Sequence, residues 1–125
     1  MGLKHRDRIP VELLDEHGSN RLTDRISQLK NMLESEPDDA FCLYGIAMEY
    51  AKAGRTDRAI AHFDRTIEVQ PDYCYAYYHK ARCLMDDDQP LEARATLEAG
   101  LEQARESGDI LAEGEIEALL GELLS

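Results

Sequence analysis

The sequence predicts an all-α protein built from stacked, antiparallel helix-turn-helix repeats. One pattern is written twice, over residues 40–73 and again over residues 74–107, and equivalent positions carry similar residues. A fixed period of this length is typical of helical arrays, in which each unit buries its apolar face against a neighbour. The chain has no run rich in Val, Ile and Thr that would predict strands, and its prolines fall mostly at inferred helix boundaries. The matched pairs are Phe41 and Tyr75, Tyr44 and Tyr78, Ala47 and Ala81, Ala59 and Ala93, Ala61 and Ala95, Phe63 and Leu97, and Ile67 and Leu101.

The repeated positions follow a motif of large, small and aromatic residues, a turn, an alanine, another aromatic and a closing proline. Both copies resemble the tetratricopeptide repeat, although Ala47 and Ala81 replace the usual glycine at a site that needs only a small side chain. Arg105 stands where the second copy should have its proline, which indicates that the array ends there. The resemblance implies a short right-handed α-solenoid. The motif residues are Leu43, Ala47, Tyr50, Gly54, Ala59, Phe63 and Pro71 in the first copy, and Tyr77, Ala81, Leu84, Asp88, Ala93 and Leu97 in the second.

Weaker signals flank the two copies. Pro37 lies one repeat length before Pro71 and follows apolar residues at the same spacing, although Arg25 occupies the alanine position. We expect one domain, residues 22–125, preceded by a tail or short helix in residues 1–21. The expected parts of this domain are a degenerate half repeat at 22–39, full repeats at 40–73 and 74–107, and a capping helix at 108–125.

The chain is strongly acidic, with a formal net charge of −12 from 26 acidic and 14 basic residues. Such a surface disfavours nucleic acid and anionic membranes as partners. General solubility, adaptation to high salt and attraction to a basic partner all fit this charge. The last predicted helix carries the greatest excess of acid, and we expect its carboxylates to face no Lys or Arg: Asp109, Glu113, Glu115, Glu117 and Glu122.

The start of the chain and its cysteines suggest a compartment. No apolar stretch follows the basic N-terminal residues, so we expect neither a secretory signal nor a membrane span, and a cytoplasmic location. Cys42, Cys74 and Cys83 all fall within predicted helices. An odd number of cysteines without a signal argues against a disulfide framework, so we expect reduced, packed thiols.

The family resemblance also implies a binding surface. In tetratricopeptide repeats the first helix of each unit lines a concave groove with its second, fifth, ninth and twelfth residues. Some members bind a partner's C-terminal carboxylates there with Lys, Asn and Arg, but Tyr44 and Met48 occupy two of those sites in this chain. The alternative for the aromatic residues is packing between adjacent helices. The expected groove residues are Phe41, Tyr44, Met48 and Ala51 in the first copy, and Tyr75, Tyr78, Arg82 and Met85 in the second, with His79, Lys80 and Arg82 able to meet an isolated carboxylate.

Catalytic and metal-binding patterns are weak. Asp86, Asp87 and Asp88 lack the later residues of a calcium loop and are expected to form a solvated turn, with Asp88 or Gln89 capping the next helix at Pro90. Cys74, His79 and Cys83 share one helix, but no second pair completes a zinc site. The chain has no phosphate-binding, dinucleotide-binding, serine hydrolase or zinc protease motif. We therefore expect no catalytic residue, metal or cofactor.

These observations favour a protein-protein interaction module or scaffold that binds a peptide or helix of an unidentified protein in its groove. The alternative is a docking subunit or homodimer that associates through the apolar terminal helix, at Leu119, Leu120, Leu123 and Leu124. A metal-binding or catalytic protein is a third possibility, which a bound metal or cofactor after purification would support.

Overall fold

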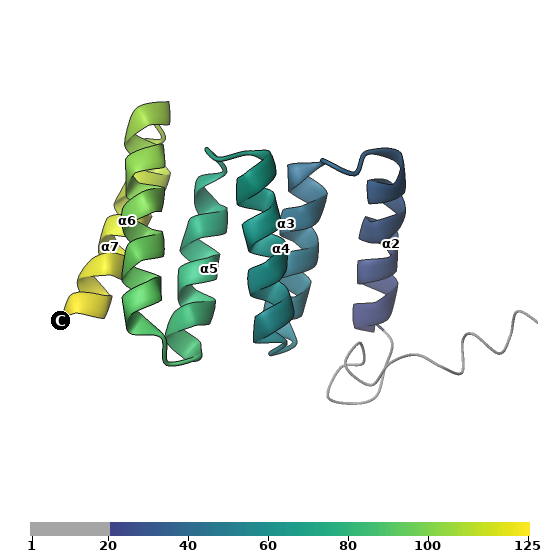
Figure 1. Cartoon of the computed structure of the whole chain (residues 1–125), viewed down its shortest axis with the longest axis horizontal. Coiled ribbons are helices and arrows are strands. Elements are labelled where there is room, and N and C mark those ends of the chain that lie inside the picture. Colours follow the sequence, from purple (N-terminus) through teal and green to yellow (C-terminus); the bar gives the residue numbers. More distant parts are fainter. Residues whose placement is uncertain (1–20) are drawn as a thin grey trace, which may run out of the picture.

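The computed structural model describes residues 21–125, with side chains from Asp24 onward, so almost all of the predicted tail at 1–21 lies outside the described residues. The described part is all-α, as predicted, and forms a row of helices that begins with α2 and ends with α7 (Figure 1). The helices are α2 (Arg21–Ser35), α3 (Ala40–Lys52), α4 (Thr56–Val69), α5 (Cys74–Asp86), α6 (Pro90–Ser107) and α7 (Ile110–Leu124).

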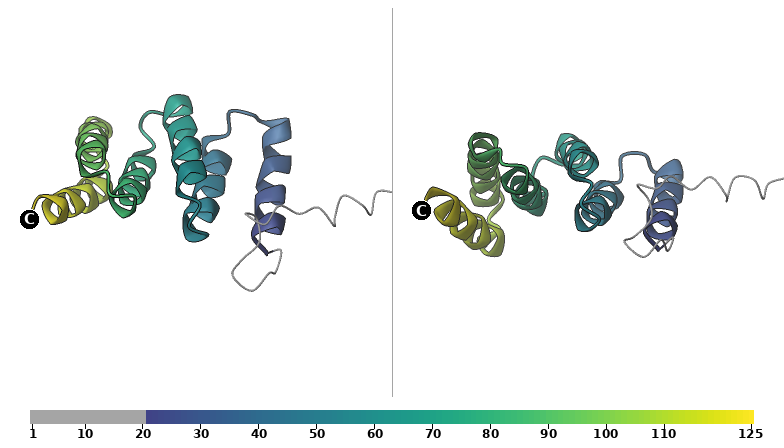
Figure 2. Two further views of the ribbon diagram at one scale, coloured as in Figure 1. Left: turned by 60° about the horizontal axis from the view of Figure 1, so that its bottom comes forward. Right: turned by 90° about the horizontal axis from the view of Figure 1, so that it is seen from below.

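Consecutive helices contact each other along the row, and alternate helices form two layers. Figure 2 shows α3, α5 and α7 on one side of the row and α4 and α6 on the other. Contacts between α3 and α5, and between α5 and α7, join the first of these layers directly. This arrangement is a helical-repeat solenoid, and α3–α4 and α5–α6 lie within the residues expected for the two full repeats. No helix in the described range is long and apolar enough to cross a membrane.

Local sequence signals explain where several helices begin and end. The carboxylate of Asp39 accepts a hydrogen bond from the Cys42 amide at 3.1 Å, and that of Asp109 accepts one from the Ala112 amide at 3.0 Å. These bonds satisfy amides that have no partner within the first turn of a helix. Helix α6 starts at a proline and ends before Gly108, whose φ of 73° is left-handed.

The turn between α5 and α6 differs from the expectation that Asp88 could cap α6. Asp88 has a positive φ of 58°, and the residue at the capping position of α6 is Gln89. The Gln89 side chain makes no capping hydrogen bond and instead donates to the carboxylate of Asp87. The acidic residues of this turn are largely exposed, as expected for a solvated turn.

Small residues bring the helices of each repeat together. Ala47 and Ala81, the two predicted contact alanines, have no exposed surface, and neither do Ala59 and Ala93. Two apolar clusters are built around these contacts, one from α2 to α5 and one from α5 to α7. Burial of each large aliphatic or aromatic side chain contributes about 1.5–3 kcal/mol to folding. The largest fully buried apolar side chains include Ile46, Phe63, Leu97 and Ile116.

The second repeat ends later than the first, and this changes the position of the last helix. Pro71 follows the end of α4 at Val69, whereas α6 continues through Arg105 and has 18 residues against 14 in α4. Helix α5 begins one period after α3, but α7 begins at Ile110, two residues later than a further period would place it. The strict period of the repeat therefore fails at α7.

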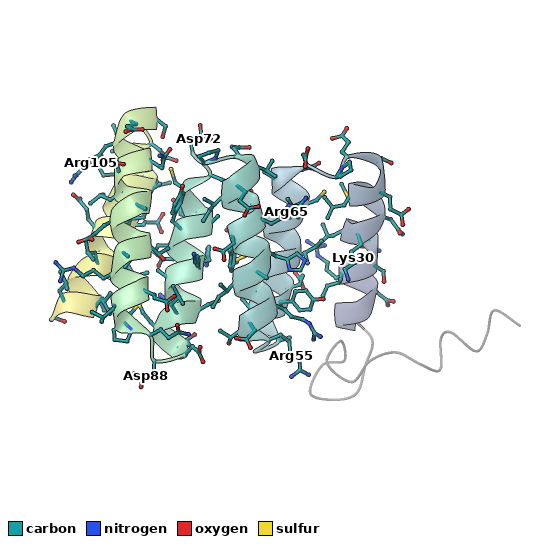
Figure 3. The ribbon with its side chains drawn as sticks, in the orientation of Figure 1. Lys30, Arg55, Arg65, Asp72, Asp88 and Arg105 are labelled. Carbon is teal, nitrogen blue, oxygen red and sulfur yellow. The ribbon has the colours of Figure 1, made fainter. Side chains whose placement is uncertain are left out.

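Arg105 also corrects the expectation that the acidic residues of the last helix face no basic group. Its guanidinium lies 3.0 Å from the carboxylates of both Glu113 and Glu117 on α7. Figure 3 shows Arg105 near the end of α6 that adjoins α7, whereas Asp88 lies at the opposite end of α6. The sequence prediction was wrong because α7 contains no Lys or Arg, and the partner comes from the neighbouring helix.

Candidate binding surface

Counting from the first residue of α3 and α5 places the predicted groove residues on one surface. All seven, together with Ala51, are exposed or partly exposed, whereas the third residue of each helix, Cys42 or Ala76, is fully buried. The fourth and eighth residues of both helices are also buried. We call the surface formed by the second, fifth, ninth and twelfth residues of α3 and α5 the groove face. Its members are Phe41, Tyr44, Met48, Ala51, Tyr75, Tyr78, Arg82 and Met85.

Tyr44 forms the centre of an aromatic cluster that joins three helices and a turn. Its ring centroid lies 4.9 Å from Tyr73, 5.9 Å from His79 and 6.0 Å from Phe63. Burial, with a smaller effect of Tyr73, raises the pKa of Tyr44 to about 12. The Tyr44 ring therefore packs between helices and also remains partly exposed on the groove face.

A second group of contacts continues from this cluster along α5. The ring of Tyr78 lies 5.0 Å from His79 and 6.2 Å from Tyr75, and the Arg82 guanidinium lies 6.0 Å from the Tyr78 ring centre. At this distance a guanidinium is attracted by the negative face of the ring. The Tyr75 hydroxyl donates a hydrogen bond to the carboxylate of Glu115 on α7. This hydrogen bond is the main reason why the pKa of Tyr75 is raised to about 12.

The other large apolar residues of the groove face differ in exposure. Phe41 has 65% of its surface exposed and is the most open aromatic side chain on this face. Met48 packs partly against the first apolar cluster, and Met85 packs partly against the second. The groove face thus combines an open aromatic ring and the exposed Arg82 with side chains that pack partly against the core.

His79 is part of this site, although its spacing did not place it among the groove residues. It lies against the rings of Tyr44, Phe63 and Tyr78, and burial followed by the charge of Arg82 lowers its pKa. Lys80, the neighbouring candidate for binding a carboxylate, is paired with Asp64 at 2.6 Å. His79, Lys80 and Arg82 therefore have separate partners in the described structure.

The residues considered for metal binding or catalysis lie in packed environments. Burial raises the pKa of the Cys42, Cys74 and Cys83 thiols, and all three are unpaired. A raised pKa leaves a thiol protonated at neutral pH, which makes it a weak nucleophile and a weak metal ligand. From Asp24 onward, no group of three or more His, Cys, Asp or Glu side chains has a geometry that could hold a metal ion.

The apolar end of α7 is largely used within the chain. Leu119 is buried, and Leu120 and Leu123 are partly buried against the second apolar cluster. Leu124 is 55% exposed and Ile110 is 80% exposed. Leu124 and Ile110 therefore remain open on α7, but the four leucines do not form one continuous exposed surface.

Comparisons with known proteins identify the family. The model of the tetratricopeptide repeat family matches residues 50–112. A TPR repeat-containing protein of Pseudomonas aeruginosa is 31% identical over 98 residues, which cover 78% of this chain and 93% of that protein. Superkiller protein 3 of Saccharomyces cerevisiae is 30% identical over 82 residues, but the match spans 66% of this chain and only 6% of that protein. The chain belongs to the tetratricopeptide repeat family.

Solved structures support the same assignment. The TPR2B domain of yeast Sti1, from a structure described as its complex with pHsp70, has a TM-score of 0.74 and 26% identity, covering 78% of each chain. A tetratricopeptide repeat domain protein from Salinibacter ruber has a TM-score of 0.66 and 32% identity, covering 70% of this chain and 89% of that one. The resemblance read from the repeat motif is thus confirmed, and domains of this family generally mediate protein-protein interactions.

Proposed function

We propose that this protein is a protein-protein interaction module that binds a peptide or helix of a partner protein across the groove face. The supporting observation is the aromatic cluster around Tyr44 and Tyr78, which fixes large side chains on a surface shared by α3 and α5. Aromatic side chains and arginine contribute much of the energy in protein interfaces. Side chains that are already ordered before binding lose less conformational entropy when a ligand arrives.

The chemistry of the groove face favours a partner with apolar side chains. Phe41, Met48 and Met85 offer apolar contact area, and methionine adapts its shape to different ligands. The Sti1 domain is described in complex with pHsp70, which shows that a related fold binds a protein ligand. Because Tyr44 and Met48 replace two residues of the carboxylate-binding pattern, we propose a ligand held mainly by apolar and aromatic contacts rather than by its terminal carboxylate.

The proposal also states that the protein acts by binding and not by catalysis, and that it acts in the cytoplasm. The packed thiols, with their raised pKa values, favour a binding role over catalysis, and the formal net charge of −12 favours protein partners over nucleic acid or anionic membranes. We propose that the protein acts in the cytoplasm, where unpaired cysteines remain reduced.

A capture experiment with matched variants tests the groove face. The intact chain is compared with Phe41→Ala and Arg82→Ala, which change exposed groove residues, and with Leu91→Ala, which removes an exposed apolar side chain from α6. Circular dichroism confirms that all four proteins are equally helical. We expect the intact chain and the Leu91 variant to capture the same protein from a lysate of the source cells, and the two groove variants to lose it. Equal capture by all four would contradict the proposal.

Self-association is a second candidate function, because Ile110 and Leu124 remain exposed on α7. Sedimentation equilibrium over a wide concentration range tests it directly. A mass that stays at one chain would remove this candidate. A mass that rises to two chains, and that Leu124→Ser returns to one, would support it.

A further inference from the structure

Helix α7 continues the groove face when its residues are counted from its own first residue, Ile110. Its second, fifth, ninth and twelfth residues are all exposed, and its third residue, Ala112, is fully buried like Cys42 in α3 and Ala76 in α5. The second, third, fifth, ninth and twelfth positions thus show the same pattern in all three helices, whereas the fourth and eighth residues, which are buried in α3 and α5, are not buried in α7. The corresponding residues of α7 are Leu111, Gly114, Ala118 and Gly121.

A contact between α5 and α7 confirms that these two faces adjoin. Tyr75, the second residue of α5, donates its hydroxyl hydrogen bond to Glu115, the sixth residue of α7. Between α3 and α5, the sixth residue of the later helix also meets a groove residue, because His79 contacts Tyr44, although Tyr44 is the fifth residue of α3 and not the second. The side of α7 that carries Glu115 thus lies beside Tyr75 of the groove face.

The strict period of the repeat does not predict which residues of α7 continue the groove face. Counting one period onward from the groove residues of α5 leads to Asp109, Ala112, Ile116 and Leu119, and the last three are buried. The longer α6 shifts the register by two residues, so the exposed side of α7 can be assigned only after the end of α6 is known.

The exposed side of α7 carries small and apolar residues, and acidic residues lie along its border. Leu111 is 70% exposed, and a Cβ atom added at Gly114 or Gly121 would meet no atom within 4 Å. Glu115 and Glu122 are exposed beside this side, and α7 itself contains no Lys or Arg. Arg105 binds Glu113 and Glu117, which are the fourth and eighth residues of α7 and belong to a different side of the helix.

From these observations we propose that the groove face extends onto α7, and that this extension binds an amphipathic helix with Lys or Arg residues beside its apolar side. The proposal rests on the proposed function and adds the class of partner. Small residues on α7 allow the backbone of a partner helix to approach closely, and its apolar side chains would cover Leu111. Its basic side chains would meet the carboxylates of Glu115 and Glu122, which no basic residue of α7 neutralises.

Charge also distinguishes this partner from a second copy of the chain. Two α7 helices that met through this side would bring their own acidic residues together, and juxtaposed like charges oppose association. A basic helix removes this repulsion and replaces it with attraction. We therefore assign the extension to a different, basic protein.

The test uses two synthetic peptides and the full chain labelled with ¹⁵N. One peptide is an amphipathic helix of Leu and Lys, and the other has the same pattern with Glu in place of every Lys. We expect the Lys peptide to shift the amide signals of Leu111, Gly114, Ala118 and Gly121 as well as those of α5. Addition of salt should weaken this binding, because the contacts between exposed charges are screened.

Two pairs of matched variants separate specific docking from general attraction to an acidic protein. Ala118→Gln adds bulk to the extension, and Ala99→Gln makes the same change at an exposed position of α6. Glu122→Lys reverses a charge beside the extension, and Glu102→Lys reverses one on α6. We expect each α7 variant to weaken binding of the Lys peptide by roughly tenfold, and each α6 variant to leave it within about twofold.

The possible results decide between the extension and the groove proposal. Amide shifts confined to α3 and α5 would overturn the extension and leave the groove proposal standing. Equal effects of the α6 and α7 variants, or equal binding of the Glu peptide, would overturn the basic helix as the occupant. Absence of shifts on all three helices would also overturn the extension. The groove proposal would then be tested by the capture experiment with the Phe41 and Arg82 variants.

Discussion

The two full repeats share one helix pattern but differ in how closely their paired helices approach. In the second repeat, a Cβ atom at Gly100 of α6 would lie only 2.6 Å from the Cβ atom of Tyr77 on α5. The equivalent position in α4 is Thr66, a fully buried residue whose hydroxyl donates to the His62 carbonyl at 2.8 Å. The first repeat must therefore leave room for a side chain where the second brings the helices together. A shared repeat motif fixes the order of the helices but not their separation.

The Leu43 and Tyr77 positions show a related difference. The Tyr77 hydroxyl donates to the Pro71 carbonyl at 2.6 Å and so connects α5 to the turn that precedes it. Leu43, its counterpart, has no polar side-chain atom that could make this bond. A shallow hollow of about 500 Å³ lies beside Leu43, between α2 and α4. Helix α5 thus has a side-chain hydrogen bond to the preceding turn that the equivalent residue of α3 cannot make.

The largest expected effect comes from Gly100→Ala. The added methyl group would overlap Tyr77 at its Cβ atom, which cannot move without moving α5. We expect the free energy of unfolding in urea, followed by circular dichroism, to fall by about 1–3 kcal/mol. Gly45→Ala is the matched control, because its nearest neighbour is the flexible end of Leu29 at 3.3 Å. Alanine also favours helix over glycine by about 1 kcal/mol, and the small shift that Leu29 must make opposes this gain. The control should therefore change the free energy of unfolding by less than about 1 kcal/mol. Equal losses in the two variants would show that the close approach at Gly100 is not special.

A smaller effect is expected from Tyr77→Phe. The substitution keeps the ring but leaves the Pro71 carbonyl without its donor, which should cost about 1 kcal/mol of unfolding free energy. Tyr78→Phe serves as the control. The ring of Tyr78 contacts Tyr75, His79 and Arg82, and its hydroxyl makes no hydrogen bond to another described residue. A loss of the same size in both variants would mean that the bond to Pro71 adds nothing.

The contact between Tyr75 and Glu115 should be visible in a spectrophotometric titration of the tyrosines. The Glu115 carboxylate favours the protonated phenol, so the folded-state pKa of about 12 lies above the unfolded value of 10.0. Stabilisation by this contact is therefore complete below pH 10 and is lost as the pH rises towards 12. Glu115→Gln should return the pKa of Tyr75 towards 10.0 while leaving the Tyr44 titration near 12. An unchanged Tyr75 titration would contradict the contact that joins α5 to α7.

The smallest expected effect is that of Arg105→Ala. Arg105 is exposed, and exposed ion pairs contribute little to stability because water and salt screen them. We expect a slight decrease in the melting temperature at low salt that disappears in concentrated salt. Arg94→Ala, which removes an exposed pair with Glu98 within α6, provides the control. A large decrease that persists in high salt would show that Arg105 holds α7 by more than its charge.

Much of the fold follows from the sequence because the repeat motif combines small residues with large ones at fixed spacing. The buried alanines Ala47 and Ala81, and the buried residues Phe63 and Leu97, lie where the motif predicts them. The groove residues of α3 and α5 could be named as well, because α5 begins one period after α3. Their binding role remains a prediction.

Features that depend on neighbouring helices could not be obtained in this way. The register of α7 depends on where α6 ends, and the replacement of a proline by Arg105 does not reveal how far the helix continues. The pairs of Arg105 with Glu113 and Glu117 join residues on two helices, whereas the prediction from the sequence considered only the charges within the last helix. The place of His79 in the aromatic cluster likewise depends on rings from α3 and α4.

The open glycines of α7 have a consequence for local stability. Each glycine within a helix costs about 1 kcal/mol relative to alanine, because the unfolded chain has more freedom to lose. Gly114 and Gly121 make no side-chain contacts that would offset this cost, so the attachment of α7 depends on its other residues, chiefly the buried Ala112, Ile116 and Leu119. Its amide hydrogens should therefore exchange with solvent through local opening, sooner than those of α5. A ligand bound along α7 would slow this exchange, so that recognition and ordering of the last helix would occur together.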